Sequence, residues 1–257
     1  MMRIFLYSDK EFEFLDEIKK YLEGKVSKAS IETRGDFVGC HTESNTDEIA
    51  AELAKIRVTD VNAPFTYNEP LYGEIEHEKR VLSGSAAPSG VLYDGMKLHG
   101  LFQSLIAPEE RNLDCVHMVL TDRLFGTFDE DDLRYHARVV ICGFPSIIST
   151  TGVVEAPAKP REFYIEKQFL GGDELAIEEL KRKFKGRFID YGDPRMAEIL
   201  KGYVMQAIFY HVFKEVFCED RGCRLYNAHW QEEMIKAQLE GPEFCERHER
   251  LAALLLK

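Results

Sequence analysis

The chain has 257 residues, with 33 basic against 45 acidic side chains and a net charge of −12. With 45% hydrophobic residues it can bury a sizeable core, and its length fits one domain, which we place at residues 1–257. Nucleic-acid binding requires a basic surface, so the acidic balance argues against it. No apolar run approaches the roughly 18 residues of a membrane span, and charges come too early for a secretory signal. We expect a cytoplasmic protein with no nucleic-acid or membrane partner.

Strand and helix patterns alternate over the first sixty residues. Residues 3–7 predict a strand, and a helix follows, with Asp9 as its N-cap and Gly24 as its stop. That helix has an apolar stripe formed by Phe12, Leu15, Ile18 and Leu22. A strand near residues 30–38 and a helix over residues 46–56 come next. The alternation predicts a sheet with helices on its face.

The middle of the chain is rich in strand patterns. Further strands are predicted at residues 91–93, 98–105, 115–120 and 137–142. Residues 150–160 contain two prolines and predict a loop, residues 162–169 predict a strand, and residues 173–184 predict a charged amphipathic helix.

The last third begins with a long helix. Asp193-Pro194 is a favourable helix start, and the wide apolar arc that follows predicts a buried helix over residues 194–217. Asn227 could cap a second helix that ends before Gly241-Pro242, and a last helix begins near Glu243. We therefore expect an α+β fold with a mixed sheet, a long central helix, and a small C-terminal cap over residues 218–257.

Three cysteines and a histidine cluster in this predicted cap. The spacing is Cys218-x4-Cys223 and, after 21 residues, Cys245-x2-His248. Two close pairs separated by a spacer are a usual way to bind structural zinc, and thiols stay reduced in the cytosol. We expect Gly222 to take a left-handed turn that brings the first two sulfurs together, and Cys245 and His248 to share a helix face. The pattern predicts one closed, structural zinc site.

The same segment resembles the archaemetzincins, a family of zinc metallopeptidases of the metzincin group. In that family, the helix motif HExxHxxGxxH runs directly into a cysteine pair and ends, after a spacer, in a CxxC pair. Phe217-Cys218 stands where the last histidine and first cysteine of the motif would be, and residues 241–248 (GPEFCERH) look like the GPEFCxxC ending, with His248 as the last ligand. Weaker similarity extends back through residues 119–125 and 138–146. The resemblance implies a zincin-like fold.

The chain departs from the motif where the family has its chemistry. The first histidine and the glutamate base fall on Ala207 and Ile208, the second histidine on His211, the glycine on Lys214 and the third histidine on Phe217. One ligand of three remains, and aliphatic or phenyl groups neither bind a metal nor move a proton. Without the glycine, we expect no reason for the helix to end at that turn.

We therefore expect a non-catalytic, zinc-binding relative whose ancestral cleft could bind a peptide or protein partner. The alternative is a divergent active metallopeptidase that completes a site around His211. The sequence does not indicate an oligomeric state.

Other groups of polar residues have a structural explanation as well as a functional one. His211 and Glu215 are one helical turn apart and could bind a metal or pair together, although a histidine bonded within the core is favoured. A second metal site could form from Cys115, His117, His136 and Cys142, but buried strand residues explain them better. Cys40-His41 is given no role, and the acidic runs at residues 74–78 and 129–132 predict solvated surface.

Overall fold

The computed structural model describes residues 1–8, 14–42 and 45–256. The expected Asp9 cap and Phe12 lie outside these residues. The strands are β1 (Arg3–Ser8), β2 (Ser30–Arg34), β3 (Leu92–Asp94), β4 (Cys115–Thr121), β5 (Leu124–Asp129), β6 (Arg134–Arg138), β7 (Val140–Ile141) and β8 (Ser146–Ser149). The helices of the first half are α1 (Leu15–Lys25), α2 (Phe37–His41), α3 (Thr46–Lys55), α4 (Tyr72–Leu82), α5 (Gly95–Leu105) and the 3-10 turn η1 (Pro108–Glu110). Those of the second half are α6 (Thr150–Glu155), α7 (Arg161–Gln168), α8 (Glu174–Lys183), α9 (Met196–Phe213), α10 (Gln231–Ile235), the π-helical segment η2 (Lys236–Glu240) and α11 (Glu246–Leu255).

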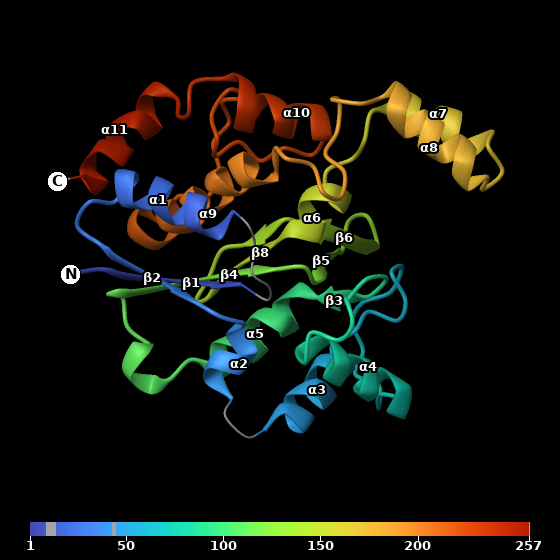
Figure 1. Cartoon of the computed structure of the whole chain (residues 1–257), viewed down its shortest axis with the longest axis horizontal. Coiled ribbons are helices and arrows are strands. Elements are labelled where there is room, and N and C mark those ends of the chain that lie inside the picture. Colours follow the sequence, from blue (N-terminus) through green and yellow to red (C-terminus); the bar gives the residue numbers. More distant parts are fainter. Residues whose placement is uncertain (9–13, 43–44, 257) are drawn as a thin grey trace.

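Two mixed sheets form the centre of the fold. The larger has the order β2-β1-β4-β8-β7, with four parallel strands and an antiparallel edge strand β7. The smaller has the order β3-β5-β6. Side chains of β1 alternate between two cores because successive residues of a strand face opposite sides. Ile4 and Leu6 belong to the core beneath α1 and α9, whereas Phe5 and Tyr7 belong to the core beneath α2 and α5. Figure 1 shows these helices on opposite faces of the larger sheet.

The expected α+β class, the mixed sheet and the long buried helix are confirmed. Within α9 twelve residues are buried, and Figure 1 shows it on the same side of the sheet as α10 and α11. The helix begins two residues later than predicted, at Met196 with Arg195 as its N-cap; Asp193 accepts a hydrogen bond from the backbone of Arg195 in the turn that precedes it.

Several predicted elements differ from the structure. Residues 98–105 lie in α5 and residues 162–168 in α7 instead of strands, and residues 150–155 form α6 instead of a loop. Their helix N-caps are Asp94, Pro160 and Ser149, and for Asp94 and Ser149 the side chain accepts a backbone hydrogen bond. Residues 30–38 are split between β2 and α2, since Asp36 caps the second of these. Short apolar runs do not distinguish strand from helix by periodicity alone.

The hairpin of α7 and α8 projects from one end of the molecule (Figure 1). It has an apolar core of its own, formed by Phe163, Leu180, Phe184 and Phe188.

The acidic run at residues 74–78 is not wholly solvated, in contrast to the prediction. Glu78 is completely buried and pairs with Arg57 at 2.5 Å and Arg123 at 2.8 Å, while the Tyr93 hydroxyl donates to the same carboxylate at 2.7 Å. Burial alone would raise the pKa of Glu78, but the two guanidinium groups and the hydroxyl hold it below its ordinary value. A buried carboxylate with these partners explains why α4 accepts so acidic a sequence.

Candidate metal centre and adjacent cleft

The four residues predicted to bind metal come together in the C-terminal cap. Their ligand atoms, the Sγ atoms of Cys218, Cys223 and Cys245 and a ring nitrogen of His248, all lie within 4.8 Å of one another. No other group of three or more histidine, cysteine or acidic residues converges in this way within residues 1–8, 14–42 and 45–256.

The spacing of these atoms fits a tetrahedral zinc ion. Sulfur atoms ~2.3 Å from zinc would be about 3.8 Å apart at a tetrahedral angle, and a sulfur and a ring nitrogen about 3.6 Å apart. The Sγ atoms of Cys218 and Cys245 are 3.8 Å apart, and Cys223 Sγ lies 3.6 Å from His248 Nδ1. The Cys245–His248 distance is shorter, at 3.1 Å. Burial raises the pKa of the Cys223 thiol to about 12, so a bound metal ion would have to displace its proton.

The four candidate ligands are positioned by a turn between the first two cysteines and by the N-terminus of α11. Asp220 accepts hydrogen bonds from the backbone of Gly222 at 2.9 Å and Cys223 at 3.0 Å, which closes the loop between the first two cysteines. Cys245 is the N-cap of α11, and His248 lies in its first turn, as predicted. Gly222 does not adopt the expected left-handed conformation. It is instead approached by Gly241, where a Cβ atom would lie 2.7 Å from the carbonyl oxygen of Gly222.

His248 is fixed by a second set of contacts. Its Nδ1 atom faces the cysteines, while its Nε2 atom lies 3.2 Å from a carboxylate oxygen of Glu215. Arg247 donates to the other oxygen of Glu215 at 2.6 Å, and the ring of Phe209 packs edge-on against the imidazole. A carboxylate on the far nitrogen of a metal-binding histidine fixes its tautomer and orientation. Glu215 therefore pairs with His248 and not with His211.

The residues at the catalytic motif positions are not brought together as a second metal site. Ala207 and Ile208 are fully buried in the main core, and Phe217 is 52% exposed. His211 is half-buried, and its Nε2 atom lies 2.8 Å from the backbone carbonyl of Leu113, so the ring is bonded but does not lie in the core as expected.

Helix α9 nevertheless ends just before Lys214, the position that the predicted alignment gives to the motif glycine. The prediction that α9 would continue to residue 217 is wrong, since α9 stops at Phe213 and Lys214 takes a left-handed conformation with φ 61° and ψ 23°. The backbone N–H groups of Lys214 and Glu215 donate to the carbonyls of Tyr210 at 3.0 Å and Phe209 at 3.4 Å. This double closure satisfies the last carbonyls of the helix and holds a non-glycine residue in a strained region.

A cavity of about 610 Å3 lies beside His211. Its walls come from the end of α9, the second half of α5, the segment before β4 and the segment before β8; His211, Lys214, Arg111 and Phe144 are among the lining residues. Cavities of this size are typical of ligand sites.

Cys115, His117, His136 and Cys142 are not brought together as a second metal site in the described parts of the chain, and Cys142 is half-buried directly after β7. Cys115 and His117 are buried in β4, as expected for strand residues. Cys115 receives a hydrogen bond from Arg3, and His136 pairs with Asp132.

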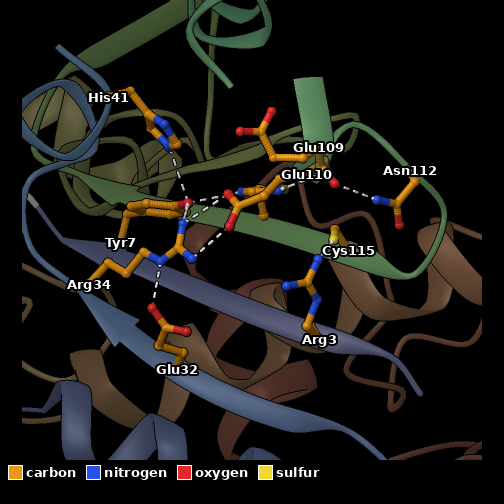
Figure 2. Close-up of polar contacts among 10 residues, drawn as sticks. Arg3, Tyr7, Glu32, Arg34, His41, Glu109, Glu110, Asn112 and Cys115 are labelled. Atoms are coloured by element: carbon orange, nitrogen blue, oxygen red, sulfur yellow. Dashed lines mark hydrogen bonds and ion pairs between the residues drawn. The ribbon is translucent and has the colours of Figure 1, made fainter. Parts of the chain in front are cut away.

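A polar cluster that the sequence did not reveal surrounds the buried Tyr7 hydroxyl. His117 Nδ1 at 3.0 Å, His41 Nε2 at 3.1 Å and Arg34 at 2.8 Å all contact this oxygen. Arg34 also forms a bidentate ion pair with Glu110, and Figure 2 shows Arg34 between Tyr7 and Glu110. Burial lowers the pKa of His117 to about 4, so this imidazole is neutral near pH 7.

Neither the Glu215–His248 contact nor the Tyr7 cluster could be found from spacing alone, although spacing singles out Glu215 as a partner for His211. The contacts join β1, β2, η1 and β4, or join residues 33 positions apart. The sequence signal was only that His117 interrupts the apolar run at residues 115–120, since Arg34 and Glu110 lie in polar segments.

In the described parts of the chain, no helix has the length and apolar character needed to span a bilayer.

Comparison with known proteins finds one matching family model and two solved structures to which the chain is similar. The family model that matches, over residues 1–255, is described as "Probable metallopeptidase family (DUF6775)". One similar solved structure is the archaemetzincin of Methanopyrus kandleri, with a TM-score of 0.48 and 10% identity, covering 99% of this chain and 95% of that chain. Another is a zinc-dependent peptidase of Methanocorpusculum labreanum, with a TM-score of 0.42 and 12% identity, covering 99% and 100%. No curated protein matches the chain. The match over nearly its whole length shows that this chain belongs to the probable metallopeptidase family.

Proposed function

We propose that this chain is a non-catalytic member of its family that binds one structural zinc ion and uses its ancestral cleft to bind a peptide or protein partner. Cys218, Cys223, Cys245 and His248 would hold the ion. With four protein ligands the site is closed, so the ion would cross-link the cap at residues 218–257 and leave no position for substrate or water. A reducing compartment such as the cytoplasm would keep the three thiols available.

The observation that carries the non-catalytic part is the chemistry of the motif positions. Ile208, at the position of the general base, is an aliphatic side chain buried in the main core, and so is Ala207 beside it. A general base must reach the water that it activates, and neither side chain has an atom that can accept a proton. A divergent active site built around His211 is the alternative, and it is favoured by the position of His211 in the cavity wall.

Metal content combined with anomalous diffraction tests both parts, since it counts the sites and locates them. We expect about one zinc ion per chain, at the cysteine cluster. Two ions per chain, with the second abolished by His211→Ala but not by the exposed control His229→Ala, would overturn the non-catalytic proposal. A metal-free protein of normal stability would overturn the structural zinc.

Peptidase activity is the second test. The purified protein is incubated with a broad pool of peptides, with and without a chelator, and the products are identified by mass spectrometry. We expect no cleavage above the blank. Cleavage that disappears with the chelator and with His211→Ala would support the active alternative.

A further inference from the structure

Arg111 and Lys214 carry unneutralised positive charge into the cavity beside His211. No Asp or Glu is among the described residues that line this cavity, although the chain has a net charge of −12. Both cations are bonded to backbone carbonyls instead of carboxylates. Arg111 donates to Ile106 at 2.6 Å and Ser104 at 2.8 Å, and Lys214 donates to His211 at 3.0 Å.

The acidic residue next to Arg111 is turned away from it. Glu110 is engaged on both carboxylate oxygens by Arg34, at 2.7 and 2.9 Å, on the side facing the sheet (Figure 2). His117 also contacts the backbone carbonyl of Glu110 at 3.4 Å, so the segment leading to Arg111 is held at two points. The guanidinium of Arg111 therefore has no internal counter-ion, and its Nη1 group makes no hydrogen bond within the described chain.

The two cations are held in place before any ligand arrives. Arg111 is held by the carbonyls at the end of α5, and Lys214 by a carbonyl at the end of α9. Fixed cations lose little conformational freedom on binding an anion, and Arg favours planar groups such as a carboxylate. Gln103 and Ser104 add neutral polar groups to the wall, and Phe144 adds an apolar ring.

From this arrangement we propose that the cavity binds the carboxylate of a peptide, with Arg111 and Lys214 as its partners. This proposal rests on the peptide-binding cleft proposed above and specifies what the cleft recognises. The carboxylate could be the C-terminus of the peptide or an acidic side chain. Lys214 would thus supply positive charge close to His211, where a catalytic metallopeptidase has its zinc ion.

Fluorescence anisotropy with labelled pentapeptide pools tests the proposal. One pool has free C-termini and no acidic side chains, a second has the same sequences amidated, and a third is amidated but contains one Asp. We expect the first or third pool to bind at least tenfold more tightly than the second, and the stronger of the two identifies the source of the carboxylate. Equal binding of all three pools, or no binding at millimolar protein, would overturn the proposal.

Variants assign the binding to the two cations. Arg111→Gln and Lys214→Gln should each weaken binding of the preferred pool by about tenfold, whereas Lys214→Arg should retain it. The exposed Lys185→Gln, which removes the same charge far from this wall, is the matched control. Equal losses of peptide affinity in Lys185→Gln and Lys214→Gln would show that the effect comes from net charge alone, and this would overturn the proposed site.

The outcomes for this site and for the proposed function can be separated. Absence of peptide binding with one zinc ion per chain would overturn only the carboxylate site and the cleft. Tight binding of the free-acid pool followed by chelator-sensitive cleavage would leave the carboxylate site in place and overturn the non-catalytic function.

Discussion

The C-terminal cap and the end of α9 are neighbouring regions that match the predicted motif in different ways. The cap matches it in side chains, whereas the end of α9 matches it in its backbone turn. The cap brings together three cysteines and a histidine at the four expected positions, and the measured Cys218–Cys245 and Cys223–His248 distances fit a tetrahedral ion. The end of α9 has a left-handed turn at Lys214, where the predicted alignment places the motif glycine, but of the predicted catalytic side chains only His211 is present. The difference indicates that the turn is needed to deliver the chain to Cys218, whether or not the helix carries out chemistry.

Two kinds of constraint explain this contrast. A ligand of a closed metal site contributes to the stability of the whole cap, because metal binding and folding are coupled. A catalytic ligand contributes chiefly to turnover, and its position can become part of the core once turnover is not needed. Ala207 and Ile208 lie in the core, as the proposed non-catalytic function would predict.

The largest expected effect is the loss of a cap ligand. Cys223→Ser should abolish zinc binding and destabilise the protein by on the order of 4 kcal/mol, because the metal cross-link of the cap is lost. Zinc content and thermal unfolding measure both effects. Cys40→Ser, which changes an exposed cysteine outside the cap, should leave both unchanged. A stable Cys223→Ser protein without zinc would mean that the cap folds without metal.

A nearly equal effect is expected at Ile208, the position that the predicted alignment gives to the catalytic base. Ile208→Glu places an unpaired carboxylate in the main core and should destabilise the protein by about 4 kcal/mol without adding a metal ion. Val212→Glu on the same helix, at a side chain 41% exposed, should have little effect on unfolding in urea. Unchanged stability of Ile208→Glu together with a second zinc ion would show that the catalytic geometry is still available.

A smaller effect on zinc binding is expected at Glu215, which contacts the candidate ligand His248. Glu215→Gln should lower the zinc affinity by roughly 10- to 100-fold, because the carboxylate orients His248. Competition with a chromophoric chelator measures the affinity. Glu219→Gln, an exposed position one residue after Cys218, is the control, and equal affinities of the two variants would contradict the role of Glu215.

The smallest effect concerns the turn itself. Lys214→Gly should stabilise the protein by about 0.5–1 kcal/mol, because glycine accepts a positive φ and relieves more strain than it adds in chain entropy. Lys214→Ala removes the same side chain but keeps the strain, so it should give no gain in chemical denaturation. Equal stability of the two variants would mean that the turn is not strained.

The sequence predicted features that depend on residues close together in the chain. The Cys245–His248 pair in the first turn of α11 and the α+β class belong to this group. The two close pairs, interpreted from their own spacing as one zinc site, come together in the structure although 21 residues separate them.

Features set by distant contacts were not predictable. The end of α9 at Phe213 depends on hydrogen bonds from a left-handed lysine that no propensity favours. Glu78 is buried because Arg57 and Arg123 meet it from elsewhere in the chain, and Glu215 turns to His248 across 33 residues. In each case the conformation depends on a residue distant in the chain, and a single sequence does not show which distant residue makes the contact.

The helical hairpin of α7 and α8 has a consequence for how this chain can be altered. Because Phe163, Phe184 and their neighbours form an apolar core inside the hairpin, its folding depends mainly on its own residues. Its tip has a pair of left-handed glycines, Gly171 and Gly172, next to Phe169, which is 83% exposed. Exposed tips of this kind accept insertions and protease cuts most readily. The hairpin is therefore the place to attach a reporter or an affinity tag without disturbing the cap or the cleft.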